Sequence, residues 1–239
     1  MYTLKNISVQ YSESSKEHYV LKNTNFIADR GTLVCIEGES GAGKSTFINV
    51  LAGIQCPTSG QSSFENNRLK LSNQKYMEKF RREKVGVVRQ NYALIKEYTV
   101  FENIALPLKY RKYKKKSIND KVEKAMKSLG IYDLSLKYPD EISGGERQRV
   151  VIARAIVTEP TVVLADEPTA ALDKRNTENV LKIFRELSTK GCYVIIATHD
   201  IKVSKACDFV YMLKDGELTE IDKKVFLDNI SMKNTYVDL

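Results

Sequence analysis

The sequence predicts an α/β fold built around a mostly parallel sheet, and three observations lead to that prediction. An apolar run at residues 32–36 leads into the glycine-rich stretch GESGAGKS at 38–45, and a helical pattern follows it. Two further apolar runs, at 161–165 and 193–198, are joined by an amphipathic helical pattern over 176–188. Because a strand, a crossover helix and a second strand on this scale form parallel neighbours, we expect one sheet with helices packed against it.

The other elements are predicted from the same periodicities, taken in chain order. The first 37 residues contain short strand patterns. Further helical patterns occupy residues 46–51, 74–82, 100–109, 119–129 and 146–157. The section between the first two of these helices is polar and rich in turn formers, so no element is predicted there. A buried strand over 84–90 ends in Gln90, and a hairpin late in the chain turns at Asp215-Gly216.

Composition and charge exclude some classes of protein and leave others open. The chain has 239 residues, with 38 basic and 30 acidic side chains and a formal net charge of +8. Since it contains no run of about 18 apolar residues, we expect no membrane-spanning helix and a cytoplasmic location. The most concentrated charge is KYRKYKKK at 109–116. This run fits a solvated helix end, a surface for anionic lipid or a surface for nucleic acid, and the sequence alone does not decide between them.

The cysteines bear on redox chemistry and metal binding. Cys35, Cys56, Cys192 and Cys207 have no C-x-x-C spacing, and three of them lie in or beside apolar segments. We therefore expect reduced, mostly buried thiols rather than disulfides or metal ligands.

The stretch GESGAGKS predicts a phosphate-binding loop. Gly38, Gly43, Lys44 and Ser45 satisfy the spacing G-x-x-x-x-G-K-[ST], between a strand and a helix as that motif requires. Glycines allow backbone N–H groups to turn towards phosphate oxygens, and the helix presents the positive end of its dipole to the same anion. Lys44 would reach the β- and γ-phosphates, and the Ser45 hydroxyl would ligate Mg²⁺. The alternative is a glycine-rich surface turn with an incidental lysine.

Two carboxylates follow the apolar strand TVVLA. Asp166 and Glu167 would lie at the carboxyl end of a strand in an open sheet, where such folds place their ligands. Asp166 suits a water-mediated contact to Mg²⁺, and Glu167 would orient and deprotonate the attacking water. A solvated acidic turn is the alternative, but carboxylates at the edge of an apolar strand need a cation or water beside them.

Polar residues also end two other strands. His199 follows the strand at 193–198 and would face the γ-phosphate, although a lone histidine at a strand end is more often structural. Gln90 would contact Mg²⁺ or the attacking water, although a lone glutamine carries little information. A functional role for either residue is favoured only because the chain also contains a phosphate loop.

The stretch ISGGERQRVVIARAI predicts a second anion-binding site in the same chain. Its two glycines open a helix, and the helix N-terminus would bind an anion together with the Ser143 hydroxyl. A second loop is useful only if it completes the nucleotide site of another copy, which predicts a two-fold dimer in which each subunit caps the other's γ-phosphate. The alternative is that S-G-G-E is an ordinary capping sequence at a helix start.

Together these motifs resemble those of the nucleotide-binding subunit of an ABC transporter, over nearly the whole chain. GESGAGKS is similar to the Walker A motif, VVLADE to the Walker B motif with its catalytic glutamate, and ISGGE to the LSGGQ signature. AALD at 170–173 is similar to the D-loop, Gln90 to the Q-loop glutamine and His199 to the switch histidine. The departures from the commonest residues of the family remove no catalytic group; they are Arg89, Ile142 and Glu146.

The resemblance gives each candidate residue a role, with ATP and Mg²⁺ as cofactors. The catalytic residues would be Glu167, His199, Gln90 and Lys44. The metal ligands would be Ser45, Gln90 and Asp166. The nucleotide would be bound by Tyr11, which is similar to the aromatic residue that stacks on adenine, and by Gly38, Ser40, Gly41, Ala42, Gly43, Lys44, Ser45, Thr46, Ser143, Gly144, Gly145, Glu146 and Asp173.

The resemblance also implies the organisation of a single domain over residues 1–239. A P-loop NTPase core with an N-terminal antiparallel β subdomain would take up residues 1–90 and 158–225. An inserted helical subdomain over 91–157 would carry the signature, and 226–239 would be a tail.

The implied function is an ATP-hydrolysing subunit that forms a head-to-tail homodimer on ATP and drives a transmembrane permease at the inner face of the membrane. QNYALIKEYTVFENIALPLKY at 90–110 resembles the MacB, LolD and FtsE group, whose permeases often transmit force, and small ATPases of this shape also accompany peptide or bacteriocin exporters. The transported substrate and the direction of transport stay open.

Two other functions would use the same ATP-binding motifs. A soluble ABC-type ATPase acting on nucleic acid usually carries coiled-coil insertions or two tandem ATPase domains, and a regulatory subunit without transport would be expected to lose the base or the switch residue. This chain has neither kind of insertion and keeps Glu167 and His199, so no nucleic-acid partner is expected.

Overall fold

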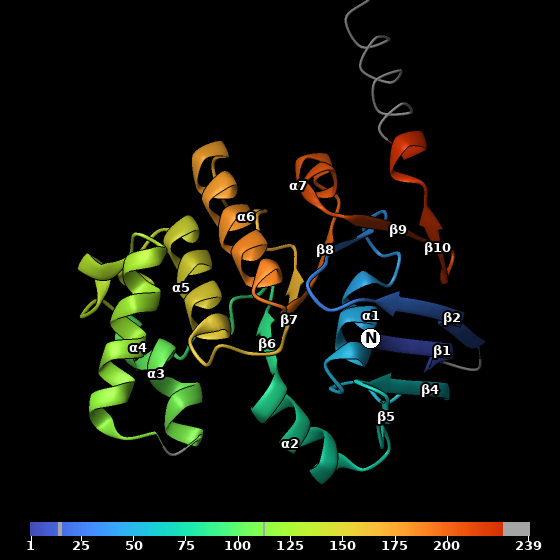
Figure 1. Ribbon diagram of the computed structural model, residues 1–239, viewed down its shortest axis with the longest axis horizontal. Helices are drawn as coiled ribbons and strands as arrows, with labels where there is room; N and C mark the ends of the chain where they lie inside the picture. Colours follow the sequence, from blue (N-terminus) through green and yellow to red (C-terminus); the bar gives the residue numbers. More distant parts are fainter. Residues whose placement is uncertain (14–15, 112, 227–239) are drawn as a thin grey trace, which may run out of the picture.

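The computed structural model describes residues 1–13, 16–111 and 113–226, which form two sheets and a group of helices (Figure 1). The larger sheet has six strands, in the order β10-β9-β3-β8-β7-β6. In that order the strands are Glu217–Ile221, Phe209–Lys214, Leu33–Glu37, Tyr193–Thr198, Val162–Asp166 and Val85–Val88. All neighbouring pairs are parallel except β9 and β10, which form the predicted late hairpin. The prediction of a mostly parallel sheet is therefore confirmed.

The smaller sheet is antiparallel and has the order β2-β1-β4-β5. Its strands are β1 Tyr2–Glu13, β2 Lys16–Ala28, β4 Ser59–Phe64 and β5 Asn67–Arg68. β4 and β5 lie in the polar section for which the local sequence indicated no element, although the antiparallel β subdomain implied by the resemblance is present. The sequence of β4, SGQSSF, has a poor strand propensity, but its Ser62 pairs with Leu4 of β1, and pairing with a long neighbour outweighs the local preference.

The helices occur where the periodicity predicts them, with longer bounds. They are α1 Lys44–Leu51, α2 Gln74–Lys84, α3 Val100–Tyr110, α4 Lys115–Ser128, α5 Gly144–Ile156 and α6 Lys174–Thr189. The six-residue α7, Ile201–Ala206, was not predicted, and two 3₁₀ turns, Tyr132–Leu134 and Pro139–Glu141, lie between α4 and α5. No helix of the described residues combines the length and the apolar character that crossing a membrane requires.

The six-stranded sheet is covered on both faces. In β3, Leu33 and Cys35 belong to the core beneath the helices, whereas Val34 and Ile36 belong to the core that the antiparallel sheet and α1 share. α1 contacts β7 and β8 of one sheet and β2 of the other. A strand buried on both faces needs no polar positions, which is why β3, β7 and β8 are continuous apolar runs.

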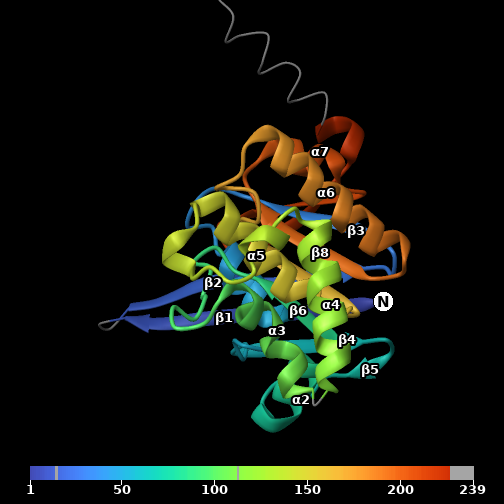
Figure 2. The same cartoon turned by 90° about the vertical axis from the view of Figure 1, so that its left-hand side faces the viewer.

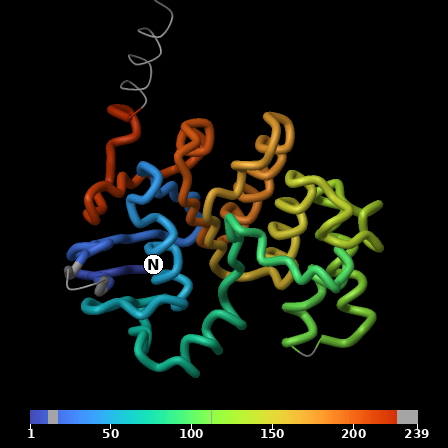
Figure 3. The backbone as a smooth tube through the Cα atoms, turned by 180° about the vertical axis from the view of Figure 1, so that it is seen from behind, coloured from blue at the N-terminus to red at the C-terminus, as the bar shows by residue number. Residues whose placement is uncertain are grey.

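The helices α3, α4 and α5 contact one another and form a group at one end of the molecule (Figure 1), and this end faces the viewer in Figure 2. Seen from behind, this group and the antiparallel sheet lie at opposite ends, with the six-stranded sheet between them (Figure 3). The three buried thiols, Cys35, Cys192 and Cys207, confirm the expectation of mostly buried cysteines. Of the expected tail at 226–239, Phe226 is buried and residues 227–239 lie outside the described residues.

The order of strands brings the candidate residues together. β3 leads into the loop at 38–45, β7 ends at Asp166, and β8 ends directly before His199. The prediction that Gln90 ends its strand was wrong, because β6 ends at Val88 and Gln90 lies two residues beyond it. All four strands are parallel, so their carboxyl ends lie at one edge of the sheet.

Candidate nucleotide site

The loop at 38–45 adopts a backbone conformation that its glycines make possible. Gly41 and Gly43 have positive φ angles, +85° and +98°. A Cβ on Gly43 would lie 2.8 Å from Val20 Cγ1, and a Cβ on Gly38 would lie 2.5 Å from the Leu213 carbonyl oxygen. Larger side chains would therefore push the loop away from β2 and β9, and the hollow beside it would lose its shape.

The Lys44 side chain extends back to the start of the loop. Its ammonium group donates hydrogen bonds to the carbonyls of Gly38, at 2.8 Å, and Glu39, at 3.0 Å. The same nitrogen lies 3.7 Å from Glu167 Oε1, and both side chains are about 8% exposed. α1 begins at Lys44 without a side-chain cap, so its first-turn N–H groups stay free to bind an anion.

Asp166 is a buried carboxylate at the end of β7. Burial raises its pKa above the usual range, and a hydrogen bond with the Ser45 hydroxyl acts in the opposite direction. Its Oδ1 has no hydrogen-bond partner among the described residues. A buried carboxylate oxygen without a partner is costly, and a bound cation would remove that cost. Hydroxyl, carboxylate and amide oxygens are also the ligands that suit Mg²⁺.

Glu167 is fixed by the end of the neighbouring strand β8. Its backbone has φ +48°, and its N–H donates to the Ala197 carbonyl at 2.8 Å. Glu167 Oε2 accepts a hydrogen bond from Thr198 Oγ1 at 2.9 Å, and Oε1 lies 2.8 Å from His199 Nδ1. The carboxylate is therefore oriented by two side chains, and it is buried where it faces the loop.

A cavity of about 380 Å³ lies between these groups, within the range typical of ligand sites. Apart from Val20, all of its lining residues were predicted: Ser40, Gly41, Gly43, Lys44, Ser45, Thr46, Gln90, Asp166, Glu167 and His199. A neighbouring hollow of about 720 Å³ is lined by the two other predicted loop residues, Gly38 and Ala42, and shares Ser40, Gly41 and His199 with the first.

Six predicted residues do not line either hollow; they are Tyr11, Ser143, Gly144, Gly145, Glu146 and Asp173. Tyr11 lies on β1 opposite His18 and is 42% exposed. Asp173 caps α6 by accepting a hydrogen bond from the Asn176 N–H at 2.8 Å. The roles of these six residues in nucleotide binding stay predictions.

Ser143 caps α5 in the way that the alternative interpretation expected. Its hydroxyl donates to Glu146 Oε2 at 2.8 Å and accepts from the Glu146 N–H at 3.3 Å. Hydrogen bonds from the Ser143 N–H and hydroxyl lower the pKa of Glu146. A Cβ on Gly145 would lie 3.2 Å from the Ala171 carbonyl, so the helix start packs against the segment similar to the D-loop. A cap and an anion site use the same helix N-terminus, so this geometry does not exclude either role.

Sequence reasoning missed three residues, of which one orients Glu167 and two bind the segment between Gln90 and α3. Thr198 orients Glu167 as described above. Asn103 is fully buried in α3 and exchanges hydrogen bonds with Ile95, donating further to the carbonyls of Tyr98 and Thr99. The only signal was a polar residue within an apolar pattern, ATHD for Thr198 and VFENIALPL for Asn103.

The third missed residue is Arg154, which joins α5 to the segment after Gln90. Its guanidinium donates at 2.7 Å to the carbonyls of Tyr92 and Ala93, and burial lowers its pKa to about 10. Because α5 begins at the signature, Arg154 links the signature helix to the loop that follows Gln90.

A phosphate loop, a buried acidic pair and a histidine at the carboxyl ends of neighbouring parallel strands define an ATPase of the P-loop class. A family model described as "ABC transporter" matches residues 21–170, and the chain belongs to that family. It is an ATP-binding subunit that hydrolyses ATP in such a transporter.

Individual relatives cover almost the whole chain. It is 38% identical over 218 residues to the uncharacterized ABC transporter ATP-binding protein YvrO of Bacillus subtilis, covering 91% of this chain and 95% of the relative. It is 36% identical over 220 residues to the bacitracin export ATP-binding protein BceA of Halalkalibacterium halodurans, covering 91% and 87%.

Solved structures of MJ0796, an ABC transporter ATP-binding protein of Methanocaldococcus jannaschii, have the same fold. A dimeric structure of that cassette matches with a TM-score of 0.88 at 33% identity, covering 93% of this chain and 99% of the other. A dimer in a post-hydrolysis state with ADP and Pi matches with a TM-score of 0.89, at the same identity and coverage. The predicted α/β fold of an ABC ATPase is therefore confirmed.

Proposed function

We propose that two copies of this chain close head to tail on two ATP–Mg²⁺ units and that this closure drives a transmembrane permease. The observation that carries the proposal is the division of the predicted residues. Lys44, Asp166 and Glu167 meet in one cavity, whereas Ser143 and Gly145 lie outside it. A second copy would supply the missing donors. The dimeric structures of MJ0796 support such an arrangement for a protein of this fold.

Within each cavity, the residues would divide the work between binding and activation. Lys44 and the loop N–H groups would hold the phosphates, and Ser45, Gln90 and Asp166 would hold Mg²⁺, which neutralises phosphate charge when bound. Glu167 would orient the attacking water and accept its proton at the carboxylate, with His199 positioning the same water. Since phosphoryl transfer depends on positioning and charge stabilisation, dividing the donors between two copies makes hydrolysis conditional on closure.

The permease would dock at the free edge of β6. A groove of about 370 Å³ there is bounded by α2, β6, α3 and α5, and its charged lining residues are Glu78, Arg81, Arg82, Arg111 and Arg154. This excess of cations suits a cytoplasmic helix of the permease that carries acidic side chains. Arg154 also binds the segment after Gln90, so a partner in the groove would lie next to the contact that joins this segment to the signature helix. The chain would then be peripheral to the inner face of the membrane.

We further infer an export or force-transmitting system of the MacB/LolD type, handling a peptide, bacteriocin, antibiotic or lipoprotein. The relative named for bacitracin export supports this, since it is 36% identical over 91% of this chain.

The test is purification of an affinity-tagged Glu167→Gln form from its native membrane in the presence of ATP, followed by identification of the bound chains. A bound membrane protein with a large extracytoplasmic domain would support force transmission, and one with transmembrane helices alone would favour simple export or import. Recovery of nucleic acid or soluble proteins without a membrane protein would contradict the proposal.

A further inference from the structure

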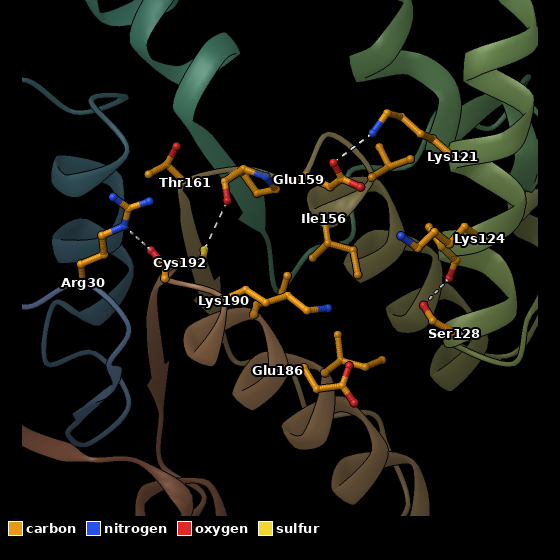
Figure 4. A pocket seen from close by; sticks show the side chains of 16 residues that line it. Arg30, Lys121, Lys124, Ser128, Ile156, Glu159, Thr161, Glu186, Lys190 and Cys192 are labelled. Carbon is orange, nitrogen blue, oxygen red and sulfur yellow. Dashed lines mark hydrogen bonds and ion pairs between the residues drawn. The ribbon is translucent and has the colours of Figure 1, made fainter.

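A separate hollow, of about 530 Å³, lies at the edge of the six-stranded sheet where β7 and β8 begin. It is bounded by α4, the C-terminal ends of α5 and α6, and the residues directly before both strands (Figure 4). The nucleotide cavity lies at the opposite edge, where β7 and β8 end, and the two hollows share no lining residue. The function described so far leaves this hollow unused.

The floor of the hollow is apolar, and several of its charged groups are already satisfied. Apolar side chains from α5, α6 and the segment directly before β7 form the floor, among them Ile156, Ile183 and Leu187. Lys121 pairs with Glu159 at 3.1 Å. Arg30 Nε donates to the Gly191 carbonyl at 2.9 Å.

Two ammonium groups remain available. Lys124 on α4 and Lys190 after α6 are exposed, and neither has an ion-pair partner among the described residues. Figure 4 shows that both side chains extend into the hollow from opposite walls, with Ile156 between them. Glu186 is the remaining carboxylate of the lining; in the same view it lies below Lys190 and away from Lys124. The hollow thus combines an apolar surface with a cationic clamp.

We propose that this hollow binds a small amphipathic organic anion and that its occupancy changes the rate of ATP hydrolysis. The apolar body would lie on the floor, and a single carboxylate, sulfonate or phosphate would lie between Lys124 and Lys190. Glu186 disfavours a second anionic group on the same molecule. No aromatic side chain occurs among the described lining residues, so the hollow offers no stacking surface for a nucleobase.

An effect on hydrolysis rests on the proposed function and on the segment that forms one wall. Ile156, which ends α5, and the following Val157 line the hollow, while Ala155 and Thr158 line the groove assigned to the permease. Residues 155–158 therefore separate this hollow from the permease groove. α5 carries Ser143 at its other end, so an occupant that fixes its C-terminal end against β7 and α4 would restrict the movement of the signature helix.

The experiment uses two probes on the full chain. Fluorescence of 8-anilinonaphthalene-1-sulfonate measures binding, and decanoate is titrated as a competitor; ATP hydrolysis is followed with and without saturating probe. We expect saturable binding that salt weakens, competition by decanoate, and at least about a twofold change in turnover.

Two variants change the site in different ways. Lys124→Gln combined with Lys190→Gln removes the clamp, and Ser128→Phe fills the hollow from the exposed surface of α4. We expect each to weaken probe binding by about tenfold, as the loss of charge-assisted contacts or of the space requires, and to abolish the effect on turnover. Lys116→Gln combined with Lys182→Gln is the matched control, because it changes the net charge equally on α4 and α6 outside the hollow.

Three outcomes would overturn the proposal. The first is that neither probe binds saturably below about 1 mM, because a weaker affinity does not indicate a specific site. The second is equal binding to the variants and the wild type, and the third is binding at the hollow that leaves turnover unchanged. If the unliganded chain hydrolysed no ATP, the proposed function would fail separately, since the binding measurements do not depend on turnover.

Discussion

The hydroxyl of Thr198 donates a hydrogen bond of 2.9 Å to the carboxylate of Glu167, across the boundary between β8 and β7. Thr198 is fully buried, and its hydroxyl also accepts a hydrogen bond from the Asp200 N–H at 3.0 Å. The hydroxyl is thus fixed as a donor towards Glu167. The direction of the carboxylate is therefore set by the end of the neighbouring strand, so Thr198 acts as a positioning residue for the base that we assign.

Replacing Thr198 with Val should lower kcat for ATP hydrolysis and leave KM for ATP nearly unchanged. Valine fills the same buried space, but it cannot donate the hydrogen bond. A hydrogen bond to a charged group contributes about 1.5–3 kcal/mol, which corresponds to roughly a 10- to 150-fold loss if all of it serves orientation. Steady-state ATPase assays measure both constants. Thr198→Ser keeps the hydroxyl and should retain most of the activity, so equal losses in both variants would contradict a positioning role.

Replacing Glu167 with Gln should preserve ATP binding, lower turnover by at least about 100-fold and accumulate a dimer. The amide keeps the shape of the side chain but cannot accept the proton from the attacking water, and removal of a general base typically costs 10²–10⁴-fold. Gel filtration with light scattering, with and without ATP, detects the dimer. Lys44→Ala in the same background should prevent the dimer by weakening phosphate binding. A Glu167→Gln form that stays monomeric and hydrolyses ATP at the normal rate would contradict the assignment.

Replacing Ser143 with Ala separates the two roles that its sequence allows. Loss of the cap on α5 should lower the free energy of unfolding by about 1 kcal/mol, as at other helix starts. Thr99 caps α3 in the same way, accepting a hydrogen bond from the Glu102 N–H at 3.2 Å, so Thr99→Ala is a matched control for stability. In the Glu167→Gln background, only Ser143→Ala should reduce the ATP-dependent dimer. Equal dimer formation in both variants would leave Ser143 as a cap alone.

Replacing Asp166 with Asn should raise the free energy of unfolding at neutral pH when no nucleotide is added. Burial raises the pKa of this carboxyl in the folded chain, so folding at neutral pH carries the cost of a buried charge. The folded state then binds its proton more tightly than the unfolded state, and stability falls as the pH rises through the folded pKa. The advantage of Asn should therefore shrink as the pH falls towards the usual carboxyl value of 3.8.

Urea unfolding at several pH values measures this difference, and Glu102→Gln provides a control with the opposite sign. Hydrogen bonds from Thr99 lower the pKa of Glu102, so its charge favours folding above the usual carboxyl pKa. That variant should lose stability at neutral pH and recover relative to wild type in acid. An Asp166→Asn form that is less stable than wild type at neutral pH would contradict the view that its burial is costly.

Local signals explain which parts of the fold the sequence predicts. The sequence predicts the loop at 38–45 and the strands β7 and β8, because a motif or an apolar run lies entirely within each of them. The sequence does not predict β4, because SGQSSF becomes a strand only through its pairing with β1, more than fifty residues earlier in the chain. The end of β6 is misplaced for a related reason, since Val88 is the last residue with a partner on β7.

The candidate site shows the same division. Motif spacing predicts the residues that line the cavity, because each motif keeps its residues close together in the chain. It misses Thr198 and Asn103, because their roles depend on contacts with Glu167 and with the loop at 95–99 that only the folded chain brings about. Residues that position other residues belong to no motif with a fixed spacing, so they can be identified only once the structure shows which residues they contact.

Reversing the charge of Arg82 should weaken association with the permease without affecting the ATP-driven dimer. Arg82 is exposed on α2 and lines the groove at the edge of β6. In Arg82→Glu, a carboxylate would face the acidic helix that we expect there, and juxtaposed like charges oppose binding. Lys79→Glu makes the same charge change on an exposed position of α2 outside the groove. Co-purification from membranes should decrease for Arg82→Glu alone, and equal recovery with both variants would place the docking surface elsewhere.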